Sequence, residues 1–273
     1  MRRRIWLKHM FTMIGSVAIS RKLGAQSTGE KSDVIIDAHC HAGKGTEMSA
    51  PWSTYADPKV TLRRAMEAGI DKTIIFPINN LTFEKANLEI AEIVKQHPEK
   101  FIGFAKHDPV REAGKIGELL TYEVQKLGLK GLKLHLLPSR EVLDVVAELG
   151  VPILFHPSRV SDFHMIASEY PQINFIMAHL GSFASQDWTE HLQAIEVARR
   201  YPNVYLETSS VVFFEYLEMA ARELPPEKLI FGSDGPLVDS RVELYKIRLL
   251  KLSPENKSKV LSGNILRLLS KQS

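Results

Sequence analysis

The sequence predicts one α/β domain, a closed (β/α)8 TIM barrel over residues 33–270 that ends in closing helices. Three observations support this prediction. Eight short apolar runs alternate with longer amphipathic segments. The runs are nearly continuously apolar, which is typical of parallel strands covered on both faces. The 273 residues also suit a barrel of about 250. A doubly wound open sheet is the alternative, but no glycine-rich phosphate loop follows the first run.

Residues 1–26 precede the barrel and read as a signal peptide. A basic cluster is followed by a mildly apolar stretch, Met10–Ile19, that is too short to span a membrane. The segment Arg3–Lys8 resembles a bacterial twin-arginine export signal, so we expect a periplasmic or secreted protein. A basic extension on a cytoplasmic protein is the alternative. Residues 27–32 are polar and read as a linker.

The predicted strands and helices follow in order from residue 33. The strands are Val34–Ala38, Lys72–Pro77, Phe101–Lys106, Gly131–His135, Val151–His156, Ile173–His179, Val204–Thr208 and Lys228–Asp234. The helices are Leu62–Ala68, Phe83–Val94, Ile116–Gln125, Arg140–Glu148, Val160–Ser168, Leu192–Arg199, Phe213–Leu224 and Ser240–Leu250. One or two closing helices are expected within Pro254–Ser270.

Charge and cysteine content exclude some classes of function. The net charge of +3 comes from the first 22 residues, which carry six basic residues and no acid. The remaining body is not basic, so we expect no nucleic-acid partner. A single cysteine, Cys40, excludes an intrachain disulfide framework and a cysteine-based zinc site. We therefore expect a small-molecule substrate, with no membrane span in the mature chain, and leave a homodimer open.

The first predicted strand ends in a His-x-His pair. Side chains alternate along a strand, so His39 and His41 point to one face while Cys40 points to the other. Two imidazoles at the end of a buried strand form half of a metal site. Cys40 is then expected to be a buried packing thiol and not a nucleophile.

Other polar residues stand at the carboxyl ends of later strands. They are His135, His156, His179 and Asp234. The carboxyl ends of barrel strands converge on one mouth, where the active sites of this fold lie. Burying these groups without partners would cost several kcal/mol each. A cation that they bind together would offset this cost, so the pattern indicates a metal site.

These motifs resemble the amidohydrolase superfamily. The matching segments are Asp37–His41, His156-Pro157, Ala178–Gly181, Phe231–Pro236 and the closing Gly263–Leu269. Their order is most similar to the amidohydrolase-2 group, which includes aminocarboxymuconate-semialdehyde decarboxylase. The resemblance covers roughly residues 33–270.

The resemblance implies one divalent metal held by His39, His41, His156 and Asp234. Zinc is the first choice because imidazole and carboxylate suit it, with Mn²⁺ and Fe²⁺ as alternatives. His179 would hydrogen-bond a water or the substrate, and Asp234 would carry a proton. Asp234 could instead cap a following helix.

Three further residues are candidates for binding an anionic substrate. Lys133 and His135 lie two apart, so both are expected to face inward. A carboxylated Lys133 bridging two metals, or Lys133 paired with Glu207, are the alternatives. Arg159 follows His156 on a loop and could clamp a carboxylate, although a solvated loop arginine has the same sequence signature.

The sequence leaves two functions in competition. The first is a metal-dependent hydrolase that attacks an amide, lactone or ester carbonyl with a metal-activated water. The alternative is a zinc-dependent non-oxidative decarboxylase, a C–C lyase, of a small carboxylic acid. A metal-dependent nuclease is disfavoured by the charge of the body. The loop 43–58 is a candidate substrate lid, and His191 reads as a surface residue.

Overall fold

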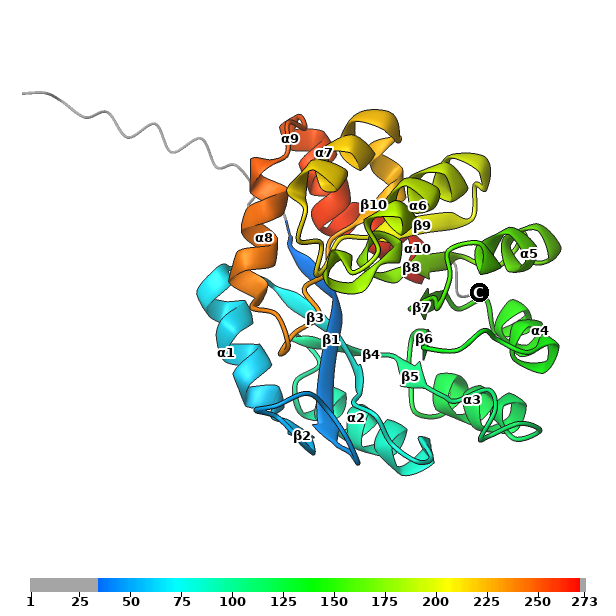
Figure 1. The fold of residues 1–273 in the computed structure, drawn as a ribbon. Coiled ribbons are helices and arrows are strands. Elements are labelled where there is room, and N and C mark those ends of the chain that lie inside the picture. Colours follow the sequence, from blue (N-terminus) through cyan, green and yellow to red (C-terminus); the bar gives the residue numbers. More distant parts are fainter. Residues whose placement is uncertain (1–33, 271–273) are drawn as a thin grey trace, which may run out of the picture. The chain divides into compact units, whose positions relative to one another are not determined.

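The computed structural model describes residues 34–270, and they form a barrel of parallel strands surrounded by helices (Figure 1). The predicted signal peptide and linker lie outside the described residues. The strands are β1 (Ile36–Lys44), β2 (Tyr55–Ala56), β3 (Lys72–Pro77), β4 (Phe101–Gly103), β5 (Ala105–Lys106), β6 (Leu132–Leu134), β7 (Ile153–Phe155), β8 (Phe175–Met177), β9 (Val204–Glu207) and β10 (Leu229–Ile230).

The predicted eight-strand order is confirmed. One sheet has the order β2-β1-β3-β4 and the other β10-β9-β8-β7-β6-β5. β4 and β5 are two parts of one barrel strand, interrupted at Phe104, whose N–H donates to the Ile75 carbonyl. β2 adds a short antiparallel pair outside the ring.

Hydrogen bonds between the first and last strands complete the ring. The Ala38 N–H donates to the Phe231 carbonyl at 3.0 Å, and the Asp234 N–H donates to the His39 carbonyl at 2.7 Å. Cys40 also forms a parallel bridge with Gly235. The start and the end of the domain therefore meet at one seam, beside the predicted metal donors.

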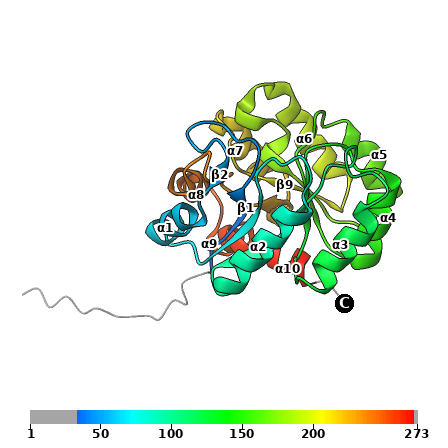
Figure 2. The same cartoon turned by 90° about the horizontal axis from the view of Figure 1, so that it is seen from below.

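Helices cover the outside of the barrel (Figure 2). They are α1 (Pro58–Ala68), α2 (Glu84–Gln96), α3 (Ile116–Gln125), α4 (Arg140–Leu149), α5 (Asp162–Glu169), α6 (Trp188–Arg200), α7 (Phe214–Glu223), α8 (Ser240–Leu249), α9 (Pro254–Ser258) and α10 (Asn264–Leu269). Within residues 34–270, no helix has the length and apolar character needed to cross a membrane.

Two apolar clusters form the core. The larger lies between strands and helices, and includes Cys40 and Ala42. The smaller fills the inside of the barrel and includes Ile36 and Ala38. α10 adds Ile265 and Leu268 to this inner cluster, so the closing helix predicted from the sequence completes the barrel core.

Candidate metal centre

A bulge in β1 aims both histidines of the His-x-His pair at the polar site. Asp37 pairs with Thr73 of β3, but Cys40 pairs with Ile75, so β1 gains one residue between these positions. Ile36 and Ala38 face the barrel interior before the bulge, whereas Cys40 and Ala42 face the helical shell after it. The extra residue thus reverses the alternation, which is how bulges re-aim side chains beside active sites.

The ring of His39 is fixed by a carboxylate from β9, which only β10 separates from β1 around the barrel. Its Nδ1 lies 2.8 Å from Oε2 of Glu207, at the end of β9. The Ser209 hydroxyl and the His179 N–H also donate to that carboxylate oxygen. With Nδ1 held by Glu207, Nε2 is left to face the pocket, which is the usual arrangement of a metal-ligating histidine.

Asp234 completes a cluster with the two histidines. Its Oδ1 lies 3.3 Å from Nε2 of His39 and 3.3 Å from Nε2 of His41. The backbone of Asp234 has φ 60°, in the left-handed region that non-glycine residues rarely adopt. Such strain gathers at functional sites, where surrounding structure enforces it.

These three donors have the chemistry and spacing of a divalent metal site. Their ligand atoms all lie within 4.8 Å of one another, and all three residues are buried. Two neutral imidazoles and a carboxylate suit Zn²⁺, Mn²⁺ and Fe²⁺. A second group of donors, His39, His179 and Glu207, meets the same spacing.

His156 and His179 lie side by side at the same pocket. Their ring centroids are 4.7 Å apart. Nδ1 of His179 lies 2.9 Å from the Ser209 hydroxyl, and its backbone has φ 57°. His156 lines the pocket with Asp234 but belongs to neither compact donor group. The predicted roles of His156 as a ligand and of His179 as a substrate contact therefore stay predictions.

Burial keeps the histidines of the site neutral. It lowers the pKa of His156 to about 2, with a further contribution from nearby His179. It lowers the pKa of His179 to about 4. The pKa values of His39 and His41 are lowered as well, again chiefly by burial. Neutral imidazole is the form that binds a metal.

Lys133 places a buried amino group beside the metal donors. Its fully buried Nζ lies 3.4 Å from Nε2 of His39 and 5.2 Å from the centroid of the Phe76 ring. Burial lowers the pKa of Lys133 to about 8. Among residues 34–270, no carboxylate lies within 4.0 Å of this nitrogen. The alternative of a direct Lys133–Glu207 ion pair is therefore wrong for this structure.

Two of these donors, His41 and Asp234, line a cavity of about 200 Å³ at the carboxyl ends of the strands. His135, His156, His179 and Asp234 face it, together with Glu47 and Met48 from the loop that follows β1. The loop predicted as a lid thus supplies part of the wall. The site thus combines metal donors with the buried amino group of Lys133 next to them.

The comparisons with known proteins agree with this geometry. A family model described as amidohydrolase, of the amidohydrolase-2 group, matches residues 36–271. The chain belongs to the amidohydrolase-2 family. No curated protein sequence matches the chain significantly.

Solved structures with the same fold include several decarboxylases. The 5-carboxyvanillate decarboxylase of Sphingomonas paucimobilis has 15% identity and a TM-score of 0.70, covering 88% of this chain and 99% of its own. The 2,6-dihydroxybenzoate decarboxylase from Rhizobium has 16% identity and a TM-score of 0.67, covering 88% and 100%. A dihydroxybenzoic acid decarboxylase from Polaromonas, with bound manganese and 2-nitroresorcinol, has 18% identity and a TM-score of 0.68, covering 87% and 97%.

Arg159 is not brought to the pocket of this amidohydrolase. Its side chain is 75% exposed, and Nη2 lies 3.3 Å from Oδ1 of Asp162 at the start of α5. It is absent from the cavity that His156 lines. The loop after β7 carries Arg159 outward, so its predicted contact with a substrate carboxylate has no support in the geometry.

Two other histidines show what the sequence pattern missed. His191 was expected on the surface, and this is wrong because α6 begins before it and turns its ring inward. Nδ1 of His191 lies 2.8 Å from the Leu180 carbonyl, and Nε2 lies 2.9 Å from the Ser185 hydroxyl. His135 was expected to face inward, and it does line the cavity; its buried Nδ1 has no hydrogen-bond partner among the described residues.

Cys40 is a buried packing thiol, as predicted. Its Sγ donates to Oδ2 of Asp37 at 3.2 Å, and the Ser233 hydroxyl donates to the same oxygen at 2.6 Å. Asp37 also accepts the Ser233 N–H. Asp37 thus joins β1 to Ser233, the residue immediately before Asp234. It holds the first and last strands together and does not face the pocket.

Proposed function

We propose that this amidohydrolase is a metal-dependent, non-oxidative decarboxylase of a small carboxylic acid. The observation that carries the proposal is the buried Lys133 ammonium, 3.4 Å from Nε2 of His39 and without a carboxylate within ion-pair distance in the described chain. A buried ammonium is costly unless an anion pairs with it. A substrate carboxylate supplies that anion. The decarboxylases that share the fold support this choice.

In this proposal His39, His41, His156 and Asp234 hold one divalent ion per chain, and the compact group of His39, His41 and Asp234 supports it. When bound, such an ion would supply Lewis acidity, drawing electron density from a substrate oxygen. Zinc remains the first choice from the ligand types, and the manganese in the Polaromonas enzyme supports Mn²⁺ as the second.

The protein groups perform the remaining steps. Lys133 holds the carboxylate that leaves, while His179, whose Nδ1 is held at Ser209, presents Nε2 to the substrate. The bond between the carboxylate and its carbon breaks, and the electron pair stays on that carbon. A proton from solvent, relayed through Asp234 at the cavity, bonds to that carbon in place of the carboxylate. Carbon dioxide is neutral, so it loses its attraction to Lys133 and departs.

Hydrolysis of an amide, lactone or ester is the second candidate. The position of Asp234 favours it, because a carboxylate that faces the cavity from between two imidazoles can accept the proton of an attacking water. The sequence alone ranks hydrolysis first. The buried Lys133 and the decarboxylases of the same fold reverse that order.

Isotope labelling separates the two reactions. The metal-loaded protein is incubated with 5-carboxyvanillate, 2,6-dihydroxybenzoate and a panel of lactones, in D₂O and separately in H₂¹⁸O. Decarboxylation releases carbon dioxide and places one deuterium on the product carbon. Hydrolysis instead incorporates ¹⁸O into a new carboxylate. Lys133→Met is expected to retain metal and lose carbon dioxide release by at least a hundredfold. Incorporation of ¹⁸O without carbon dioxide release would reject the proposal in favour of hydrolysis.

A further inference from the structure

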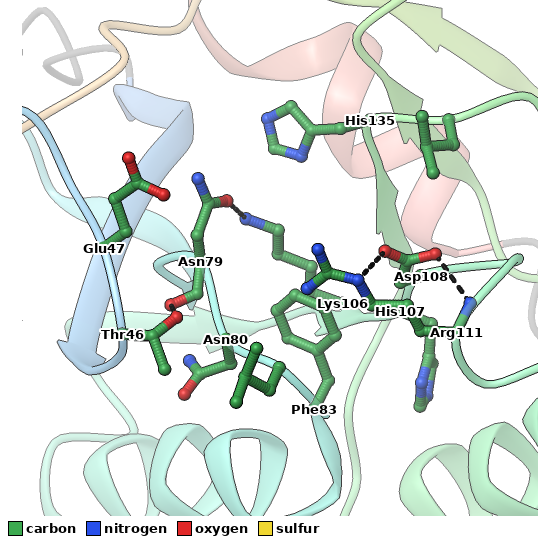
Figure 3. A pocket seen from close by; sticks show the side chains of 12 residues that line it. Thr46, Glu47, Asn79, Asn80, Phe83, Lys106, His107, Asp108, Arg111 and His135 are labelled. Atoms are coloured by element: carbon green, nitrogen blue, oxygen red, sulfur yellow. Dashed lines mark hydrogen bonds and ion pairs between the residues drawn. The ribbon is translucent and has the colours of Figure 1, made fainter.

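A second, larger cavity adjoins the candidate metal centre. It measures about 550 Å³ and shares Glu47, Asn79 and His135 with the smaller cavity that Asp234 lines. Most of its remaining wall comes from β5 and from the segments after β3 and β5 (Figure 3). The two cavities are therefore adjacent, and a substrate that spans both would pass His135.

Lys106, at the end of β5, is the buried amine of this second cavity. Burial lowers its pKa well below the usual range, so an anionic partner is needed to hold it as an ammonium. Its side chain is 2% exposed. Nζ donates one hydrogen bond, to Oδ1 of Asn79 at 2.9 Å, and lies 5.3 Å from the centroid of the Phe83 ring. Figure 3 shows Asn79 and Lys106 meeting below His135. An ammonium has three donors, so the contacts of Lys106 leave donor capacity for a ligand.

A structural lysine in the same protein shows the contrast. Nζ of Lys228 donates to three carbonyl oxygens, those of Tyr201, Pro202 and Val204, at 2.7–3.0 Å. Lys106 is more deeply buried than Lys228, and within residues 34–270 its Nζ makes a single hydrogen bond, to Asn79. Packing alone therefore does not account for an ammonium placed there.

The other charged groups around this cavity are mostly engaged elsewhere. Asp108 pairs with Arg111, whose side chain is 58% exposed. His107 lies between Glu112 and Glu123, at 3.0 Å and 2.8 Å. Glu47 is exposed on the loop after β1. No described carboxylate comes within ion-pair distance of Lys106, so an anionic group of a ligand is the partner that fits.

We infer that the substrate carries two acidic groups, and that Lys106 binds the second one. This inference rests on the proposed function, which places the reacting carboxylate beside Lys133. The second acid group, a carboxylate, lies in the larger cavity and receives hydrogen bonds from the Lys106 ammonium. His135, at the boundary, contacts the part of the substrate between the two acids. The substrate class is thus a small dicarboxylic acid.

Isothermal titration calorimetry of the Mn²⁺-loaded protein tests this inference with matched probes. The pairs are isophthalate with 3-carbamoylbenzoate, and glutarate with glutaramate. Within each pair, an amide in the second compound replaces one carboxylate of the first. In at least one pair, the dicarboxylate is expected to bind tenfold tighter than its monoamide. Lys106→Gln is expected to reduce that preference to within twofold. Lys106→Arg, which keeps the charge, retains most of the preference, and Arg111→Gln retains all of it.

The outcomes separate this inference from the proposed function. If the monoamides bind only to the metal-loaded protein but no dicarboxylate is preferred, the second subsite is rejected and the proposed function stands. If no probe binds more tightly to metal-loaded than to metal-free protein, both are rejected. A preference that persists in Lys106→Gln, or that Arg111→Gln abolishes, also rejects the role of Lys106. The comparison within each pair uses the wild-type protein, so it does not depend on the folding of any variant.

Discussion

Nδ1 of His39 lies 2.8 Å from Oε2 of Glu207, and both side chains are fully buried. The two residues are 168 positions apart in the chain and meet across the inside of the barrel. With Glu207 as a carboxylate, Nδ1 carries the proton and the lone pair of Nε2 lies on the side of Asp234. The orientation of a metal donor thus depends on a residue that is not itself among the four predicted ligands.

Replacing Glu207 by Gln should weaken metal binding by 10- to 100-fold, because carboxylates behind ligating histidines raise their basicity and fix their rings. Competition with a chromophoric chelator measures the affinity. Glu112→Gln is the control, since Glu112 also holds a buried histidine but lies outside the donor groups. Equal affinities in Glu207→Gln and the wild type would show that the pair has no role in metal binding.

The neighbouring rings of His156 and His179 should respond differently to substitution. His156→Ala is expected to lose most of its metal, because His156 is a predicted ligand. His179→Ala is expected to retain metal and lose turnover, because its role is to contact the substrate. Elemental analysis after gel filtration reports metal content for both variants. Because His179 forms a compact donor group with His39 and Glu207, loss of metal in His179→Ala alone would exchange their roles.

Gly232 should tolerate no side chain. A Cβ at this position would lie 2.4 Å from Oε1 of Glu207 and 2.9 Å from Cβ of His39, so the pair must separate to admit a methyl group. Gly232→Ala is therefore expected to reduce metal affinity by at least tenfold and to lower the melting temperature. Gly263→Ala is the matched control, because its nearest contact would be 3.7 Å. Wild-type metal affinity in Gly232→Ala would refute the close approach.

The stability of the barrel should fall between about pH 6.5 and pH 9 through His107. Burial alone would lower the pKa of His107, but hydrogen bonds to Glu112 and Glu123 outweigh it and raise the pKa to about 9. Since the folded pKa exceeds the unfolded value of 6.5, the stabilisation is complete below pH 6.5 and is lost as pH rises through about 9. The shift corresponds to about 3 kcal/mol.

Urea unfolding of the wild type and His107→Gln at pH 6 and pH 9.5 measures this contribution. The difference in unfolding free energy between the two proteins should shrink by about 3 kcal/mol at the higher pH. His164→Gln, at an exposed histidine on α5, provides the reference for changes unrelated to this network. A difference that stays constant with pH would mean that His107 is not charged in the folded protein.

Most strands and helices of the barrel can be predicted from local sequence patterns. The apolar runs identify all eight barrel strands, and the predicted helix Ile116–Gln125 is reproduced to the residue. The helix that begins at Pro58 was predicted to begin at Leu62. The signal was present, because Asp57 caps that helix by accepting the Lys59 N–H and Pro58 occupies its first turn. The late prediction for α6 has the same cause, since Asp187 caps it.

The contacts of the site are harder to read, because they join residues distant in the chain. Alternation along β1 correctly placed His39 and His41 together, but the bulge that sets their direction depends on pairing with β3. Glu207 and Lys106 are single charged residues at the ends of apolar runs, and nothing local distinguishes a buried partner from an exposed end. Arg159 shows the converse. Its loop position suggested that its side chain would line the pocket, but the side chain is exposed to solvent.

The hydrogen bond from the Asp234 N–H to the His39 carbonyl has a further consequence for how the protein is assembled. During synthesis the imidazoles of the first strand leave the ribosome long before the carboxylate of the last. The histidines of the first strand and Asp234 can bind one ion together only after the barrel has closed. Metal binding is then among the final events of maturation. The bound ion stabilises the contact between the first and last strands, where the ring would otherwise begin to open.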